Sequence, residues 1–252
     1  MNDDQAREAP LAVPAVERKH FARNFITQAV CEFRFPTLFE LEQEKPPPDL
    51  AHALRKEYPT HERLTGLKLD ANGGGAKPHT SHAFRSRKDR WTVNLRASTL
   101  SLETSHYDSF EEFQTRLEFV LRAAEKTIDA DFFTRVGLRY INGIPCKRDD
   151  IKDWVNSDLV GPLASGIYGQ PQEFSQRVVG TTALGGGFMF NHGLGVNAKT
   201  GQFQYVLDYD FFSEDIALDD AMTTVKQLHD AQHSLFRWSI GSRANDYLGF
   251  KN

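Results

Sequence analysis

The chain has 252 residues, a net charge of −4 at pH 7, and 40% hydrophobic residues. This composition predicts a folded protein with a sizeable core, and the acidic balance argues against broad electrostatic attraction to DNA. The sequence contains no run of about eighteen apolar residues that would span a bilayer. Residues 1–20 lack the apolar core of a signal peptide and are expected to form a flexible tail. Two cysteines, Cys31 and Cys146, are too few for an extracellular disulfide framework, so we expect a cytoplasmic protein that binds neither DNA nor membranes.

The first half of the chain predicts a strand, a short helix, three further strands and a long helix. The opening strand ends at Pro36 and alternates polar and apolar residues. Asp49 is placed to cap the short helix, at about residues 49–57. In the closing helix, Ser109 and Glu112 stand in capping-box spacing, and apolar residues recur every three or four positions. The three strands between the helices are expected at residues 64–69, 82–87 and 91–95, with a glycine loop at 73–75.

The second half repeats this order. Its first strand ends in the run Gly137–Ile141, which has the same alternation as the strand that ends at Pro36. A glycine in the turn at 197–201 supplies the positive φ that a hairpin needs. The closing helix carries an apolar stripe that includes Leu228 and Trp238. The elements are expected at residues 133–141 (strand), 150–160 (helix), 174–183, 188–196 and 202–212 (strands) and 219–240 (helix).

Both halves therefore predict the order β-α-β-β-β-α, and we interpret the chain as a duplicated unit. Strands that alternate polar and apolar residues bury one face. The prediction is an α+β fold in which two repeats, 21–130 and 131–252, form one curved antiparallel sheet with helices packed on one face. This topology resembles the doubled helix-grip arrangement of TATA-binding-protein-like folds. The likeness concerns topology, and DNA binding does not carry over with it.

Four runs carry a closer resemblance. They are AVCEFRF at residues 29–35, LSLET at 100–104, GLRYIN at 137–142 and LDYD at 207–210. Together they resemble a sporadically distributed bacterial family of uncharacterised proteins. Because that family has no established activity or catalytic residues, the resemblance implies a single bacterial domain and transfers no site.

Few residues are candidates for chemistry. His229 and His233 stand four apart on a predicted helix and project from one face, but a zincin needs Glu directly after the first His, and Asp230 stands there. Asp208 and Asp210 alternate on a predicted strand, so their carboxylates would need a third oxygen ligand to hold a cation. We predict no catalytic residue, no metal ligand and no cofactor, although a triad assembled from distant loops leaves no sequence signature.

The remaining candidate surface is the sheet face opposite the helices. Arginines on such a face are expected to grip an acidic peptide, a phosphate-bearing ligand or nucleic acid through bidentate hydrogen bonds. The alternative is a face that is only solvated, because any one-sided antiparallel sheet is polar on its outer side. The basic segment 85–90 adds local positive charge in a predicted hairpin turn. The predicted partner-binding residues are Arg34, Asn94, Arg96, Arg139, Gln204 and Asp208.

These observations favour a non-enzymatic protein-binding or regulatory protein whose partner is another protein. From the sporadic distribution of the resembled family, we expect it to act in a bacterial stress or defence system. Two alternatives stay open. One is a small-molecule or nucleotide-ligand sensor with a pocket between sheet and helices, and the other is a metal-dependent hydrolase that uses the histidine or the aspartate pair.

Overall fold

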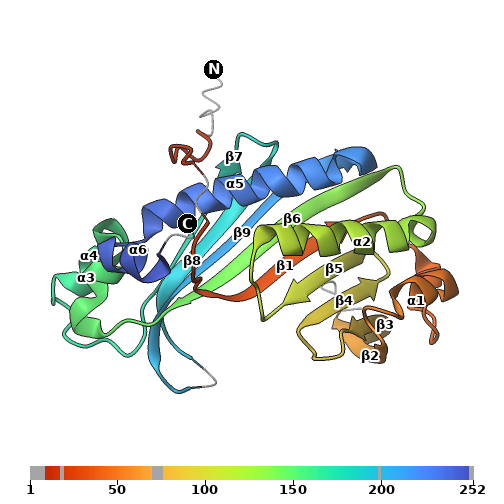
Figure 1. Cartoon of the computed structure of the whole chain (residues 1–252), viewed down its shortest axis with the longest axis horizontal. Coiled ribbons are helices and arrows are strands. Elements are labelled where there is room, and N and C mark those ends of the chain that lie inside the picture. Colours follow the sequence, from red (N-terminus) through yellow and green to blue (C-terminus); the bar gives the residue numbers. More distant parts are fainter. Residues whose placement is uncertain (1–8, 18–19, 70–75, 198–199, 250–252) are drawn as a thin grey trace. The chain divides into compact units, whose positions relative to one another are not determined.

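A computed structural model describes residues 9–17, 20–69, 76–197 and 200–249. It shows an α+β fold with one open antiparallel sheet of nine strands, in the order β2-β3-β4-β5-β1-β6-β9-β8-β7 (Figure 1). The predicted fold class is therefore confirmed. The strands are β1 (Ile26–Arg34), β2 (Thr60–Leu69), β3 (Ala76–Arg85), β4 (Trp91–Arg96), β5 (Thr99–Thr104), β6 (Phe132–Ile144), β7 (Ser175–Thr182), β8 (Gly186–Val196) and β9 (Phe203–Ala217).

The described residues also form six α-helices, which pack against the sheet. Among them, no helix combines the length and the apolar character that a bilayer-spanning segment requires. The helices are α1 (Pro48–Leu54), α2 (Phe110–Ile128), α3 (Ile151–Trp154), α4 (Ser157–Ala164), α5 (Ala221–Ser239) and α6 (Ser242–Leu248), and the 3₁₀ turns are η1 (Phe39–Glu42), η2 (Arg148–Asp150) and η3 (Leu218–Asp220).

The predicted order of elements is wrong in two places. The first half contains an additional strand, β5, which pairs with β1 on one side and β4 on the other, and whose Leu100 and Leu102 are fully buried. In the second half, the predicted helix at 150–160 is two short helices, α3 and α4, separated by Val155 and Asn156. The predicted glycine loop at 73–75 and parts of the predicted tail, residues 1–8 and 18–19, lie outside the described residues.

The strands of the two halves follow the same order on either side of the neighbouring strands β1 and β6. On one side it runs β1-β5-β4-β3-β2, and on the other β6-β9-β8-β7. In both directions the last strand of a half lies beside the first strand of that half, as a duplication would place them. Superposition of the two halves stays a prediction.

The chain divides into two compact units, each with a core of its own. Unit 1 comprises Met1–Thr27, Arg139–Ser213 and Lys226–Asn252, and unit 2 comprises Gln28–Leu138 and Glu214–Val225. The boundaries fall inside β1, β6, β9 and α5, so these four elements contribute residues to both units.

In unit 2, helix α2 covers the sheet through one apolar stripe. The hydroxyl oxygen of Ser109 accepts a hydrogen bond from the amide of Glu112 at 3.2 Å, so this half of the predicted capping box is present. The helix ends at Asp129, whose φ is 40° and whose amide donates to the carbonyl of Glu125. The buried stripe consists of Phe110, Phe113, Leu117, Val120, Ala124 and Ile128.

In unit 1, the core is an aromatic layer between the strands β8 and β9 and the helix α5. Phe190 and Tyr209 stack with 4.8 Å between ring centroids and 4° between ring planes. Ser239 of α5 is fully buried, and its hydroxyl donates to the carbonyl of Leu235 at 2.7 Å. The predicted apolar stripe is wrong at Trp238, which is 39% exposed. Leu235 is buried, and the helical repeat of 3.6 residues brings Ser239 rather than Trp238 back to the same face.

Replacing Phe113 by Asp is expected to lower the free energy of unfolding by about 3–5 kcal/mol. The Phe113 ring is fully buried against Trp91, with 5.8 Å between ring centroids, and the substitution would bury a carboxylate there. Thr115→Asp, on the exposed side of α2, is the matched control and should change stability by about 0.5 kcal/mol or less. Urea denaturation measures both, and equal losses would contradict the assigned helix phase.

Candidate functional site

The outer sheet face of unit 2 carries three of the predicted partner-binding residues. Strand register places Arg34 and Arg96 in one row across β1, β5 and β4, and Asn94 in the next row. The alternate residues Phe33 and Leu95 are buried, so these three side chains face away from the core. Arg34 is already engaged, because its Nε donates to Oε1 of Glu32 at 2.6 Å.

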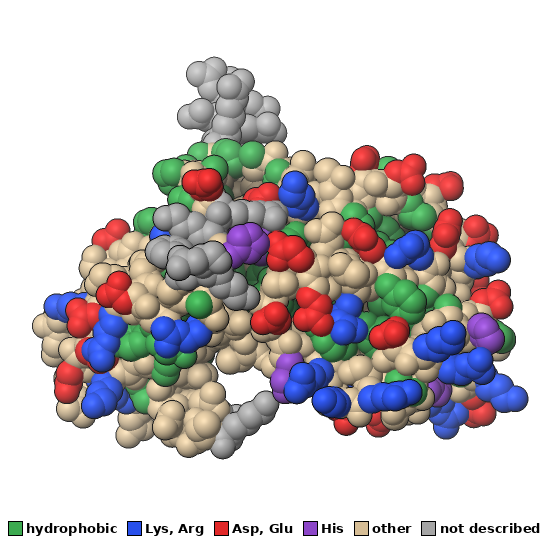
Figure 2. Space-filling view, viewed as in Figure 1, with side chains coloured by type: hydrophobic (Ala, Val, Ile, Leu, Met, Phe, Trp, Pro, Cys, Tyr) green, Lys and Arg blue, Asp and Glu red, His purple; other side chains and the backbone are tan. Residues whose placement is uncertain are grey.

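Positive side chains also gather elsewhere in unit 2. Figure 2 shows Lys and Arg over α1 and the strands β2 to β4. The basic segment 85–90 joins β3 to β4 there, as the sequence predicts. Arg85 pairs with Glu62 at 3.2 Å across β2 and β3, and both side chains are exposed. Acidic and basic groups are therefore mixed on this surface, and exposed pairs of this kind contribute little to stability.

The outer sheet face of unit 1 carries the other three predicted residues, Arg139, Gln204 and Asp208. The guanidinium of Arg139 grips the Asp208 carboxylate in a bidentate ion pair, with Nε to Oδ1 at 2.8 Å and Nη2 to Oδ2 at 2.7 Å. Hydrogen bonding to Asp208 raises the pKa of Arg139 above its usual value. The second predicted acid, Asp210, also interacts electrostatically with Arg139.

These ion pairs change what the arginines offer to a partner. An incoming carboxylate has to compete with Glu32 for Arg34 and with Asp208 for Arg139. Bidentate pairs of this kind are stronger than neutral hydrogen bonds, so the competition is costly for Arg139 in particular. A role of these residues in binding stays a prediction.

Arg139→Ala is expected to lower the free energy of unfolding by about 1–3 kcal/mol, because it leaves the largely buried Asp208 carboxylate without its bidentate donor. The double variant Arg139→Ala/Asp208→Asn should recover part of this loss, since the amide carries no charge. Denaturation of the single and double variants measures the coupling. A single variant as stable as the wild type would show that the pair contributes nothing.

The two residue pairs considered for metal chemistry have other contacts. His229 Nδ1 lies 3.2 Å from the hydroxyl of Tyr140, and the ring of His233 packs against Phe21 with 6.0 Å between centroids. Asp208 is the partner of Arg139. Within the part of the chain that the structure describes, no group of three or more His, Cys, Asp or Glu side chains is placed to hold a metal ion. The metal-dependent hydrolase hypothesis gains no support from this geometry.

A second titratable cluster lies inside unit 1. Nδ1 of His192 lies 2.6 Å from the Tyr205 hydroxyl, which also lies 3.5 Å from the carbonyl of Leu159 in α4. Burial lowers the pKa of His192 from 6.5 to about 4 and raises the pKa of Tyr205. Burial also raises the pKa of the nearby Cys146 thiol to about 11, so this thiol is not an activated nucleophile. His192 and Tyr205 are buried and serve the packing of the core.

The free energy of unfolding is expected to fall by up to about 3 kcal/mol between pH 6.5 and pH 4 through His192. In this window the unfolded chain takes up a proton at the imidazole that the folded chain does not bind. In His192→Gln, the loss of free energy of unfolding over this pH range should be smaller by the His192 contribution. Urea denaturation at pH 7 and pH 4 measures both proteins. Burial also lowers the pKa of His82. His82 therefore lowers stability at acidic pH in the wild type and in His192→Gln alike. An unchanged pH dependence in the variant would contradict the assignment.

The most exposed strand of unit 1 is β7, which lies at the end of the sheet (Figure 1). It pairs with β8 along its length, from Ser175 opposite Gly193 to Thr182 opposite Gly186. The side chains of Val178 and Val179 are 47% and 67% exposed. No strand lies beyond β7 in the described chain. Its outer side therefore presents backbone and apolar side chains to solvent together.

The outward backbone groups of β7 follow from one hydrogen bond. The amide of Leu11 donates to the carbonyl of Thr181 at 2.9 Å, so Thr181 points away from β8. The amide and carbonyl of one strand residue point to the same side, and the side alternates along the strand. Arg177 and Val179 therefore also direct their amides and carbonyls outward, whereas Val178 bonds inward to β8 opposite Phe190. We call this outward row of Ser175, Arg177, Val179 and Thr181 the β7 edge.

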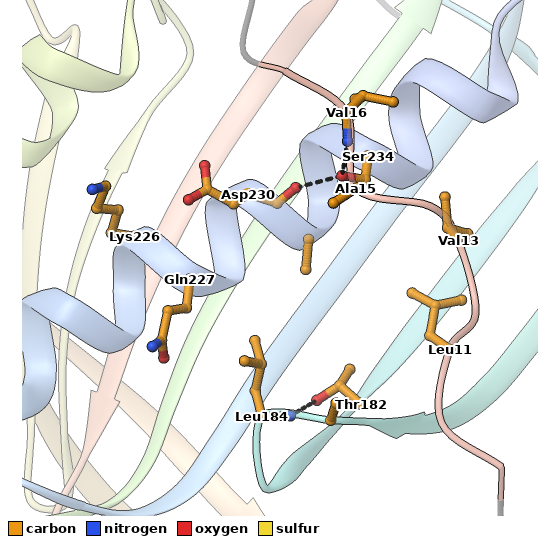
Figure 3. Close-up of a pocket in the computed structure, with 12 residues that line it drawn as sticks. Leu11, Val13, Ala15, Val16, Thr182, Leu184, Lys226, Gln227, Asp230 and Ser234 are labelled. Atoms are coloured by element: carbon orange, nitrogen blue, oxygen red, sulfur yellow. Dashed lines mark hydrogen bonds between the residues drawn. The ribbon is translucent and has the colours of Figure 1, made fainter.

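A pocket of about 680 Å³ lies beside the end of this edge (Figure 3). Its walls come from residues 11–16, from the β7–β8 turn at residues 182–184, and from residues 226–234 of α5. Gly185, with φ of 72°, makes the tight turn that holds Leu184 at the pocket. Most of the lining side chains are apolar. Polar groups at its border include Lys226, Gln227 and Asp230.

Sequence reasoning does not single out this region. The β7 strand is predicted, at 174–183, but its run Arg177–Gly180 has no polar and apolar alternation that would mark an exposed edge. Residues 11–16 fall in the predicted tail. Residues 9–16 consist only of Ala, Pro, Leu and Val, so the sequence has no alternation there that would mark one covered side.

The chain matches no protein-family model and no curated protein. The resemblance to a sporadic bacterial family therefore stays a prediction.

Proposed function

We propose that this protein is a non-enzymatic binding protein that takes up an extended segment of another protein along the β7 edge. The observation that carries the proposal is the exposed row of backbone groups on the last strand of the sheet, next to exposed Val178 and Val179. An extended peptide adds itself to such an edge as a further strand. Main-chain hydrogen bonds then give affinity, and side chains at alternate positions give specificity.

The side chains of the β7 edge indicate the chemistry of the partner. Register places Arg177 opposite Asn191 and Val179 opposite Met189, so both project from the outer sheet face. Arg177 is exposed, and a neighbouring strand would set a cross-strand residue about 5 Å away. The partner segment we propose carries an acidic residue opposite Arg177 and an apolar residue opposite Val179.

The other end of the sheet is a poorer site for the same event. The β2 edge carries Glu62 and Arg63, which are in ion pairs with Arg85 and Glu44. Neighbouring charges of both signs that are already held in ion pairs oppose pairing with another chain more than the single Arg177 of the β7 edge does. This difference between the two edges supports β7 as the binding strand.

One observation favours the small-ligand alternative. The pocket beside the β7 edge has a volume of about 680 Å³, within the range of small-molecule sites. Its apolar walls with Lys226 and Asp230 at the border suit an amphipathic ligand. The bacterial stress or defence setting belongs to the proposal as well, and it is supported by the sequence resemblance alone.

The test uses short peptides selected for binding from a displayed random library. Val179→Pro removes one outward amide and no bond to β8, so the fold tolerates it as an edge position. We expect this variant to bind the selected peptides at least about tenfold more weakly than the wild type. Val179→Thr changes the side chain and keeps the amide, and it should retain binding.

Two further results complete the comparison. Val178→Pro removes an amide that bonds to β8, so it should destabilise the fold by about 3 kcal/mol, in contrast to Val179→Pro. Circular dichroism and thermal melts report the folding of all three variants. Selected peptides that bind a folded Val179→Pro protein as tightly as the wild type would refute binding along the β7 edge.

A further inference from the structure

The N-terminal segment at residues 9–17, which we call the strap, already occupies one end of the β7 edge. The Leu11 amide donates to the Thr181 carbonyl at 2.9 Å, and the Val16 amide donates to Oγ of Ser234 in α5 at 3.4 Å (Figure 3). The Ser234 hydroxyl in turn donates to the carbonyl of Asp230. The strap is thereby bonded both to the edge strand and to the helix across the pocket.

The strap places its side chains with period two. Leu11 and Val13 line the pocket and are half-buried, whereas Ala12 and Pro14 are exposed. Ala15 and Val16 also line the pocket, but they are exposed. Figure 3 shows Leu11 and Val13 side by side along one wall, with Leu184 across the space from them. This is the pattern of an extended chain with one apolar side, read by a pocket of matching chemistry.

We infer that the strap is a built-in occupant of the binding surface, and that the partner is an extended segment of the same pattern, with apolar side chains two residues apart, which displaces it. This inference rests on the proposed function. A partner strand that follows the β7 edge from Ser175 reaches the Thr181 carbonyl, where Leu11 already bonds. Its next apolar side chains take the places of Leu11 and Val13 in the wall of the pocket.

A partner segment can displace the strap because the strap makes few contacts. The strap is held by the amides of Leu11 and Val16 and by side chains that are only half-buried or exposed. It owes its occupancy to its covalent connection, which acts as a local concentration on the order of millimolar. A segment that pairs along the whole edge makes more backbone bonds than the strap does, and so competes with it. The strap sets the affinity threshold that a partner must exceed.

The test uses a fluorescent peptide with the sequence of residues 9–17 and the full-length protein. Leu11→Asp/Val13→Asp in the protein removes the apolar side of its own strap and opens the pocket. This variant should bind the peptide with a dissociation constant at least about tenfold lower than the wild type, in which the strap competes. Ala12→Asp, on the exposed side of the strap, is the matched control and should behave as the wild type.

A second variant and a second peptide keep the outcome clear. Ser234→Ala removes the acceptor for the Val16 amide. The peptide carries the same amide, so this variant weakens the strap and the peptide alike and should bind the peptide no more tightly than the wild type. A peptide with Asp in place of Leu11 and Val13 should not bind any of the proteins. Equal binding of the original peptide to all variants, or none to Leu11→Asp/Val13→Asp, overturns the inference.

This failure differs from a failure of the proposed function. Library peptides that bind Val179→Pro as tightly as the wild type, together with a strap peptide that behaves as stated, would refute binding along the β7 edge. The strap would still be displaceable. If the library peptides depend on Val179 and the strap peptide binds all variants equally, the function holds and the inference is overturned.

Discussion

Each edge strand of an open β-sheet has a row of amides and carbonyls that bond to no neighbouring strand. These unpaired rows determine how the protein can bind another chain. One edge, β2, is blunted by charged side chains in ion pairs, Arg63 with Glu44 and Glu62 with Arg85. The other, β7, presents exposed valines and is partly covered by the strap at Thr181. The proposed function depends on this difference between the charged side chains of the β2 edge and the exposed valines of the β7 edge.

The rest of unit 1 holds β7 in a fixed shape. β7 is paired with β8 over its whole length, and β8 is anchored in turn by the stacked rings of Phe190 and Tyr209 and by the bond between His192 and Tyr205. The buried side of this layer is thus rigid, and its pairing with β8 fixes the conformation of β7. Binding to a preformed edge avoids the entropy cost of ordering the receiving strand, so even a short segment binds usefully.

Local signals predict part of this structure and not the rest. Helix α2 is predictable because its cap at Ser109 and its apolar repeat are encoded within one stretch of chain. The side on which Arg34 and Arg139 lie follows from the period of a strand, which is also local. The identity of the edge strand is set by the order of nine strands, and the pairing of Leu11 with Thr181 joins segments far apart in sequence. Neither leaves a local signal, so the β7 edge and the strap emerge only in three dimensions. The ion pair of Arg139 with Asp208 is hidden for the same reason.

Amide hydrogen exchange, measured residue by residue, tests the central claim most directly. In the free protein, the amides of Arg177 and Val179 should exchange rapidly and those of Val178 and Gly180 slowly, because the first pair points outward and the second bonds to β8. Addition of a selected peptide should slow exchange at Arg177 and Val179 by an order of magnitude or more, as new main-chain bonds form. Unchanged exchange at these two amides in a saturated complex would contradict strand addition along β7.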